Sequence, residues 1–547
     1  MEPKPAENNQ RSRQVKPVEV LYMLLLLNVL LGAVVIIFPE GKIAIGDWFT
    51  LKSTPLSKVF TADTTKIVDV KDVIKGLETV DTTLENMAGT ATFKLENEKI
   101  EVPLNRVIQY PDNTQMALKN FFDALVQTEN TGKLLHIIHY GDSQLEGDRI
   151  SDYLRNKMQL IFGGFGPGVV LPMDVSRSRV SILQNESADW QKYAIYGKTN
   201  KAEQGKYGLG GSSYRFTGNG RRKIGTDTVI QKIYIKTASL DSIKVPSGLD
   251  TPKFTTKSVV VERVDSSKYY YDTLHTPIYE VVQNKQSWLK FNCAKSSYPR
   301  VRKFNLVKIL YSSNSSLDAR VQIDDSTRDI NFPIAPVLGV KTLRPGFINK
   351  GINFTFNGGE SPYFYGFVFE GDSGVQVDNF PMRGSSGTGF ESINPNVLVA
   401  QYKALNAKLI ILQYGINVVP NPQKNYDYYQ RLFSAQLAAI KRAAPDMSVL
   451  VIGPSDMSTR IDGAYASYPN ITLIRDAMQK AAFANNCAFW DLFAAMGGQN
   501  SMVSWVNDKP ALAGKDFTHF TPKGAQYVGE MLYDALMKEY LRYKQVQ

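Results

Sequence analysis

The stretch Leu134–Gln144, LLHIIHYGDSQ, decides the fold class of this 547-residue chain. It begins with an apolar run of strand length that stops at Gly141. A helical pattern precedes it over Met116–Gln127, and a second helix is expected over Asp148–Phe162. Helix, strand, sharp turn and helix in this order predict the first unit of a parallel sheet covered by helices.

The C-terminal third repeats this alternation of strands and helices. Strands are expected near residues 374–377, 409–413, 449–452 and 488–491, and helices near 426–444, 471–485 and 523–540. In folds of this kind the functional loops follow the carboxyl ends of the strands. The sequence therefore predicts an α/β domain with its site at one edge of a parallel sheet.

Between these halves, residues 175–370 have a different texture. Short segments of alternating polarity are separated by polar or glycine- and proline-containing turns, and long helical patterns are missing. Such a texture predicts an antiparallel β-sandwich inserted into the α/β domain. Its expected strands include residues 229–236, 258–264, 278–283, 288–291 and 305–311.

An uncharged run over residues 20–38 predicts a membrane-spanning helix. Its 19 residues, rising about 1.5 Å each, match a hydrocarbon core about 30 Å thick. The run is longer than the apolar part of a cleavable signal peptide, and no cleavage site follows it. Arg11, Arg13 and Lys16 precede it, so residues 1–19 are expected in the cytoplasm and the remainder outside the membrane.

The formal charge of +11 does not by itself indicate a nucleic-acid binder. Lysine and arginine are spread along the chain, and no nucleic-acid-binding motif is present. We therefore expect no nucleic-acid partner. A solvated basic surface is one interpretation of this charge, and attraction to anionic polysaccharide or lipid is the other.

Ser143, in Gly141-Asp142-Ser143-Gln144, is the candidate nucleophile, because its hydroxyl would stand at the sheet edge beside backbone N–H groups. A serine nucleophile needs a base, and the base needs an orienting carboxylate. Asp516 lies three residues before His519, just ahead of the last expected helix. The carboxylate can reach Nδ1 of that histidine and leave Nε2 for the serine.

Two further strand ends carry candidate oxyanion donors. Asn417 lies in Gln413–Asn417, QYGIN, and its amide can donate to an oxyanion without adding charge, although a turn-supporting role is the alternative. The run 383–389, RGSSGTG, can bring a backbone N–H close to a ligand, or it is simply a flexible loop. Either Gly384 or Gly387 could supply that N–H.

The remaining histidines are expected to be structural. His136 and His139 are three residues apart in a strand and so point to opposite faces, which excludes a paired metal site there. His275 lies in a β-like stretch. Aromatic residues of the inserted region could stack on sugars, although such residues more often belong to a core. They include Tyr269, Tyr270, Tyr271 and Trp288.

Together these blocks resemble the SGNH (GDSL-like) hydrolase family. The family's serine, glycine, asparagine and Asp-x-x-His blocks occur in order as Ser143, Gly384, Asn417 and Asp516 with His519. The closest resemblance is to bacterial peptidoglycan and polysaccharide O-acetylesterases whose fold is interrupted by a β-sandwich. Gln144 and Ile416-Asn417-Val418 depart from the common pattern and leave the substrate class open.

The resemblance implies a flavodoxin-like three-layer α/β/α hydrolase domain with an inserted module. The expected organisation is 1–19 cytoplasmic, 20–38 transmembrane anchor, 39–115 stalk or lead-in, 116–174 with 371–547 hydrolase domain, and 175–370 inserted β-sandwich, with carbohydrate binding a possible role of the insert. In a bacterium the catalytic part would lie on the periplasmic or extracellular side of the inner membrane.

The implied activity is removal of O-acetyl groups from an envelope glycan such as peptidoglycan. Ser143, His519 and Asp516 would be catalytic, and Ser143, Gly384 and Asn417 would form the oxyanion hole. No metal or organic cofactor is implied. One alternative is an O-acetyltransferase supplied by a membrane-bound O-acyltransferase partner. The other is a glycan-binding scaffold with a vestigial site.

Overall fold

The computed structural model divides the chain into two compact units, Met1–Ile67 and Val68–Gln547. The structure describes residues 17–38, 42–45, 49–52, 69–75, 77, 100–112, 114–174, 179–197, 199–246, 254–283, 286–348, 350–461 and 463–546. The first unit contains helix α1 (Pro17–Ile37) and the antiparallel strands β1 (Lys42–Ile45) and β2 (Phe49–Lys52). No helix in the described part of the chain is long and apolar enough to qualify as a membrane span. Anchoring through residues 20–38 stays a prediction.

The second unit is built on a five-stranded parallel sheet. Its strands, in spatial order, are β17 (Val375–Pro381), β3 (Leu135–Gly141), β18 (Ala407–Gln413), β19 (Ser448–Ile452) and β22 (Ala488–Trp490). Numbered along the chain, this order is 2-1-3-4-5, which is the flavodoxin-like order. The α/β class and the parallel sheet predicted from the sequence are confirmed.

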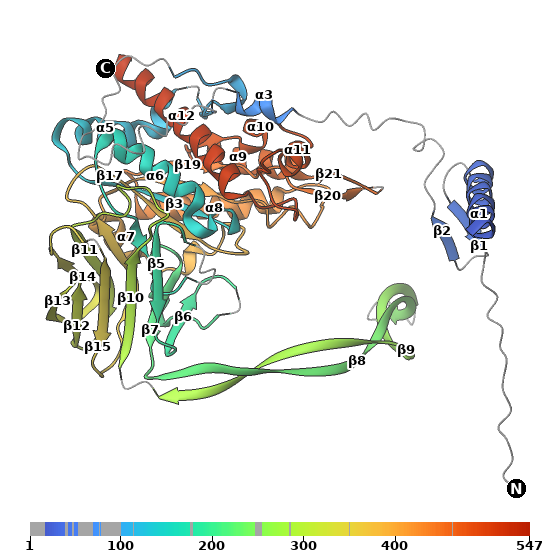
Figure 1. Cartoon of the computed structure of the whole chain (residues 1–547), viewed down its shortest axis with the longest axis horizontal. Helices are drawn as coiled ribbons and strands as arrows, with labels where there is room; N and C mark the ends of the chain where they lie inside the picture. The colour runs from blue at the N-terminus through green and yellow to red at the C-terminus, as the bar shows by residue number, and fades with distance from the viewer. Residues whose placement is uncertain are drawn as a thin grey trace, which may run out of the picture. The chain divides into compact units, whose positions relative to one another are not determined.

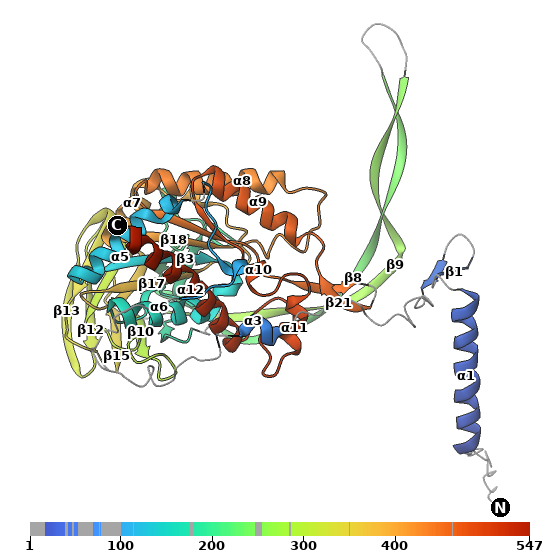
Figure 2. The ribbon, with the colours of Figure 1, turned by 90° about the horizontal axis from the view of Figure 1, so that it is seen from above.

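Helices cover both faces of this sheet. Successive strand residues point to opposite sides, and both sides carry apolar residues that must be buried. Ile137 and Ile411 join the buried cluster on one face, whereas Ile138 and Ile410 join the cluster on the other. The first face packs against α5 (Lys119–Thr131), α6 (Arg149–Phe162) and α12 (Pro522–Val546), and the second against α7 (Pro395–Ala404), α8 (Asp427–Ala443) and α9 (Ile471–Ala484). Figure 2 shows the two helical layers with the sheet between them.

Shorter elements connect these layers. They are α3 (Val70–Ile74), α10 (Leu492–Ala495), α11 (Ser501–Asn507), the 3-10 turns η1 (Leu104–Arg106), η2 (Gln115–Leu118), η3 (Ser143–Asp148), η4 (Glu203–Gly205) and η5 (Phe390–Ser392), and the hairpin β20 (Ser458–Ile461) with β21 (Ala464–Ser467).

The chain between α6 and β17 contains two antiparallel sheets (Figure 1). They share one aromatic core. One sheet contains β13 (Ser326–Phe332), β12 (Leu317–Ile323), β15 (Gly351–Phe356), β10 (Ser287–Cys293) and β5 (Ile182–Glu186). The other contains β14 (Ala335–Leu343), β11 (Leu306–Ser313), β16 (Tyr363–Glu370), β7 (Ser212–Phe216) and β6 (Trp190–Ala194), with β4 (Gly168–Val170) paired to β16. Residues from both sheets, such as Phe291, Phe354 and Phe367, meet between them. This arrangement is a β-sandwich placed within the α/β fold.

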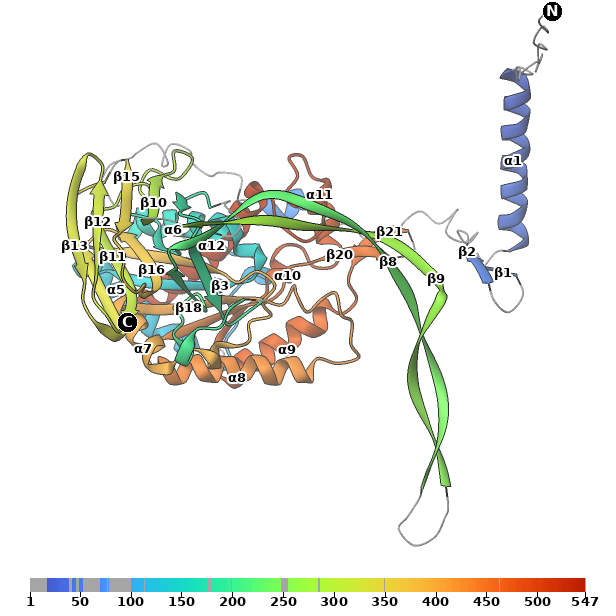
Figure 3. The ribbon, with the colours of Figure 1, turned by 90° about the horizontal axis from the view of Figure 1, so that it is seen from below.

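Three segments expected as sandwich strands lie elsewhere. Residues 229–236, 258–264 and 278–283 belong to β8 (Asn219–Pro246) and β9 (Phe254–Gln283), which pair with each other and with no other strand that the structure describes. Figure 3 shows these two strands twisting about one another. Alternating polarity predicts a strand but not its partner, so the sequence pattern could not separate this ribbon from the sandwich. The side chains of Tyr269, Tyr270 and Tyr271 lie outside the described part of the structure.

Part of the expected lead-in, 39–115, packs into the α/β body. Gln109 exchanges two backbone hydrogen bonds with Phe489, at 2.8 and 2.9 Å. Val70, Ile74 and Ile108 are buried in the same cluster as the helices over the first sheet face. These described segments of the lead-in therefore extend the core of the α/β body, because their apolar side chains complete that cluster.

A buried ion cluster joins the parallel sheet to the sandwich. Nδ1 of His136 on β3 lies 2.7 Å from Asp378 on β17, and its Nε2 lies 2.9 Å from Glu370 on β16. Lys308 on β11 lies 2.6 Å from the other Glu370 oxygen. His136, Asp378 and Glu370 have no exposed side-chain surface, so the charges must compensate each other.

His136→Gln is expected to lower the free energy of unfolding in a pH-dependent way. Burial opposes the charge, but Asp378 and Glu370 raise the pKa of His136 to about 9. The stabilisation is complete below the unfolded pKa of about 6.5 and is lost as pH rises through about 9. Urea unfolding should show the wild-type advantage shrinking by about 2 kcal/mol between pH 7 and pH 9.5.

His139→Gln is the matched control, because burial lowers the pKa of His139 to about 4 and leaves it neutral at both pH values. Its difference from wild type should stay constant. The same constancy for His136→Gln would contradict the charged cluster.

Candidate active site

The loop after β3 presents Ser143 at the carboxyl edge of the sheet. Asp142 caps the following turn by accepting a hydrogen bond of 3.0 Å from the Gln144 N–H. A Cβ at Gly141 would lie 2.7 Å from the Leu145 side chain and 2.9 Å from the Gln413 carbonyl, so glycine is required there. Burial raises the pKa of Asp142 to about 7. Ser143 is 9% exposed and faces an open hollow.

Ser143, His519 and Asp516 form a continuous hydrogen-bonded chain. The Ser143 hydroxyl lies 2.8 Å from Nε2 of His519, and Nδ1 of that ring lies 2.8 Å from Oδ2 of Asp516. Burial by itself would raise the pKa of Asp516, but hydrogen bonds from His519 and Thr518 hold it below the ordinary value. Asp516 therefore remains a carboxylate at neutral pH and can orient the imidazole.

The loop that carries Asp516 and His519 has a strained backbone, and residues of a neighbouring hairpin hold it in place. Phe517 has a positive φ of 54°, which is unusual for a bulky residue. The N–H of Ser458 in the β20–β21 hairpin donates to the Phe517 carbonyl at 3.1 Å. The ring of Tyr465 in the same hairpin stacks on Phe517 with centroids 3.6 Å apart. These contacts hold the backbone in the conformation that points His519 toward Ser143.

Gln144 ties the serine loop to the histidine loop. Its Nε2 donates to the Thr518 carbonyl at 2.7 Å and to the Ser455 hydroxyl at 3.2 Å. Thr518 immediately precedes His519, so the residue next to the serine also positions the base. The sequence marked Gln144 only as a departure from the family pattern.

Two of the expected oxyanion donors, Gly384 and Asn417, line the same hollow as Ser143, whereas Gly387 does not. Gly384 lines the hollow with open space around its Cα, whereas a Cβ on Gly387 would lie 2.8–2.9 Å from Tyr414 and Phe433. Gly387 therefore has a packing role. Asn417 also lines the hollow, and its Nδ2 donates to the Ser385 carbonyl at 2.9 Å. An amide nitrogen carries two hydrogens, so one remains for a ligand.

Three charged residues complete the hollow and were not predicted. Arg383 forms a two-pronged ion pair with Glu146, and Arg149 donates to the Phe520 carbonyl at 2.8 Å. The lining residues are Ser143, Glu146, Arg149, Arg383, Gly384, Asn417, Asp516 and His519. The sequence offered no signal for the Glu146–Arg383 pair, because the two residues lie on loops 237 positions apart.

The other histidines lie outside this hollow. His136 belongs to the buried ion cluster, and His139 contacts Gln413 and Ser151 at 3.1 and 3.0 Å. His275 lies on β9, opposite Thr228.

Residues 353–527 match the model of the GDSL-like Lipase/Acylhydrolase family. This part of the chain is similar to that family. The resemblance expected from the sequence is thereby confirmed, as is the expectation of an ester-hydrolysing enzyme. The match begins within the sandwich and contains Gly384, Asn417, Asp516 and His519, while Ser143 lies before it.

Several solved structures are similar to parts of this chain. A structure described as a peptidoglycan O-acetylesterase in action is 17% identical, with a TM-score of 0.52, and the alignment covers 80% of this chain and 99% of that one. An acetyl xylan esterase is 17% identical over 30% of this chain and 81% of its own, with a TM-score of 0.23. A family two carbohydrate esterase from Clostridium thermocellum, in complex with cellohexaose, is 10% identical over 47% of this chain and 94% of its own, with a TM-score of 0.21. A search of curated proteins by sequence gave no match.

Gln144→Leu is expected to lower kcat about tenfold on a small acetyl ester with little change in KM, because the His519 loop loses its tie to the serine loop. Steady-state kinetics and a thermal melt on the same sample measure both effects. Gln159→Leu is the matched control, since Gln159 is a buried glutamine bonded to Gly166 and Gln376 away from the hollow. A similar loss of kcat in both variants would show that Gln144 acts only through stability.

Proposed function

We propose that this protein is a serine esterase that removes O-acetyl groups from a glycan. The observation that carries the proposal is the Asp516–His519–Ser143 chain, with both hydrogen bonds at 2.8 Å, in an open hollow at the sheet edge. A nucleophile, a base and an orienting carboxylate in this geometry are the requirements of acyl transfer through a serine.

In the proposed reaction, Ser143 Oγ attacks the ester carbonyl while His519 Nε2 takes the hydroxyl proton. His519 then returns that proton to the departing sugar oxygen, which leaves an acetyl group on Ser143. Water, deprotonated by the same nitrogen, attacks this acyl-enzyme. His519 then returns that proton to Ser143 Oγ as the acyl–oxygen bond breaks, which releases acetate and restores the serine. Asp516 holds the imidazole tautomer with Nδ1–H toward itself and stabilises the ring when it is charged.

The oxyanion formed in both steps would be bound by the N–H groups of Ser143 and Gly384 and by Asn417 Nδ2. Gly384 and Asn417 both line the hollow beside the serine. The Ser385 carbonyl holds the Asn417 amide in place, so this donor is oriented before charge develops.

Two observations support a glycan as the substrate. The catalytic hollow is open, which suits one ester on a long chain better than a small enclosed ligand. The fold similarity to the peptidoglycan O-acetylesterase extends over 80% of the chain, so it includes more than the hydrolase domain. Remote sugar units bound beside the hollow could assist the reaction at one ester.

We also propose that residues 20–38 anchor the protein in the bacterial inner membrane with the catalytic domain outside the cytoplasm. The uncharged run and the preceding Arg11, Arg13 and Lys16 motivate this proposal. The full-length protein should remain in the membrane pellet after alkaline carbonate extraction. Release into the supernatant would contradict the anchor.

Ser143→Ala should lower acetate release by about three orders of magnitude or more, because the nucleophile is lost.

Asn417→Ala, which removes one oxyanion donor, should lower kcat by about 10²–10³-fold with a smaller effect on KM. Acetate release from a chromogenic acetyl ester and from O-acetylated peptidoglycan measures both, with circular dichroism as the control for folding. Near-normal turnover by folded Ser143→Ala would overturn the mechanism, and acetyl transfer to an added sugar in preference to water would indicate a transferase.

A further inference from the structure

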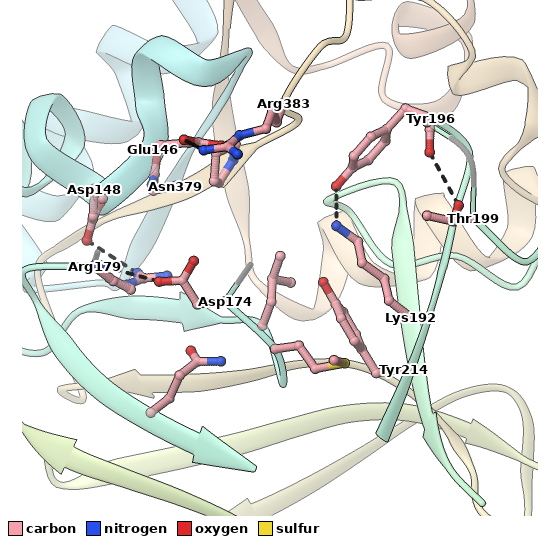
Figure 4. Close-up of a pocket in the computed structure, with 16 residues that line it drawn as sticks. Glu146, Asp148, Asp174, Arg179, Lys192, Tyr196, Thr199, Tyr214, Asn379 and Arg383 are labelled. Carbon is pink, nitrogen blue, oxygen red and sulfur yellow. Dashed lines mark hydrogen bonds and ion pairs between the residues drawn. The ribbon is translucent and has the colours of Figure 1, made fainter. Parts of the chain in front are cut away.

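A second cavity lies next to the catalytic hollow, between the hydrolase domain and the sandwich. Its volume is about 220 Å³, and it shares Glu146 and Arg383 with the hollow. Its other lining residues include Asp148, Arg179, Gln184, Lys192, Tyr196 and Tyr214. Figure 4 shows Lys192, Tyr196 and Tyr214 on one side of this cavity and Glu146, Asp148 and Arg179 on the other.

The carboxylates of the cavity already have cationic or N–H partners. Glu146 is paired with Arg383, and Asp148 lies 2.9 Å from the buried Arg155 and 3.3 Å from Arg179. Asp174 accepts a hydrogen bond of 3.3 Å from the Arg179 backbone N–H. The acidic wall is therefore largely neutralised by the protein itself.

Lys192 has no carboxylate within contact distance in the described part of the chain. Its Nζ lies 2.9 Å from the Tyr196 hydroxyl and 4.8 Å from the centre of that ring, and in the described part of the chain it contacts no carboxylate. Asp174 acts on it only from beyond contact distance. A partly buried ammonium ion without a carboxylate is a costly arrangement, and it is the arrangement that binds an anionic ligand most strongly.

A second donor in the cavity is also unused. Nε2 of Gln184 is buried and has no hydrogen-bond partner among the described residues. Gln184 lies on β5, while Lys192 is on β6 in the facing sheet, so both sheets of the sandwich contribute donors to one cavity. An unpaired buried amide in a native structure requires an explanation, and a ligand oxygen is one.

We propose that this cavity is a subsite for a carboxylate-bearing sugar, with Lys192 pairing the carboxylate and Gln184 donating to a neighbouring oxygen. The proposal deepens the proposed function and rests on it, since the sugar would belong to the same glycan as the ester. A single cation that contacts no carboxylate of the described residues matches a singly charged carboxylate. Because the cavity and the catalytic hollow share the Glu146–Arg383 pair, one glycan chain can occupy both, with the acidic unit beside the acetylated unit.

Turnover of acidic and neutral glycans by the full-length protein tests the subsite. Lys192→Met keeps the length of the side chain and removes the charge. The ratio of kcat/KM on O-acetylated polygalacturonate to kcat/KM on 4-nitrophenyl acetate should fall about tenfold or more, as expected for a lost charged hydrogen bond. The same ratio for O-acetylated glucomannan, which is neutral, should not change.

Lys290→Met is the matched control, because Lys290 is exposed on β10 and lies against Trp288 away from the cavity. It should leave both ratios at the wild-type value. Equal ratios in wild type and Lys192→Met on the acidic glycan would overturn the subsite and would show that Lys192 is a structural partner of Tyr196.

Binding without catalysis separates this inference from the proposed function. Ligand-observed NMR should detect glucuronate binding to the wild-type protein and its loss in Lys192→Met, with glucose as the neutral control. Glucose 6-phosphate binding more tightly than glucuronate would overturn the assignment to a carboxylate, as would undiminished glucuronate binding by Lys192→Met. If glucuronate binding follows Lys192 while no glycan releases acetate, the subsite stands and the proposed reaction fails.

Discussion

The parallel pairing of β3 with β17 on one side and β18 on the other is the constraint on which the site depends. The register places Gly141 opposite both Pro381 and Gln413, so all three strands end at the same level. The loops that follow must then emerge together. Ser143, Gly384 and Asn417 lie next to one another because of this register, although 274 positions separate the first from the last.

The proposed base, His519, reaches this edge by a different route. His519 precedes α12, which packs against α6 on the first face of the sheet, so its loop is placed by helix packing rather than by strand register. Helix packing alone leaves a loop free to adjust. Gln144, Ser458 and Tyr465 remove that freedom through two hydrogen bonds and one ring stack. The positive φ of Phe517 is tolerated because these contacts surround it.

The sandwich leaves the hydrolase domain after α6 and returns to it at β17, which is one of the strands that carries the site. Its attachment must therefore be rigid for the site to stay aligned. The His136–Asp378–Glu370–Lys308 cluster supplies a directional link between β3, β17, β16 and β11. Moving one of these strands would separate the partners and leave a buried charge uncompensated. The cluster therefore favours one position of the strands relative to each other. The cavity that contains Lys192 is lined by residues of both the sandwich and the α/β domain.

The sequence by itself determined the α/β class, the strand ends at the edge of the hollow, and the candidates Ser143, Asn417, Asp516 and His519, which the structure places around that hollow. These features are encoded locally: an apolar run with a polar residue directly after it shows both the strand and the point where it ends. The tertiary structure decided which strands, segments and side chains contact one another. It assigned 229–236 to an isolated ribbon, packed residues near Ile108 into the core, and gave Gln144 its role. It also brought Gln184, Lys192 and Arg383 to one cavity, because pairing and packing depend on residues far apart in the chain, which a local pattern does not record.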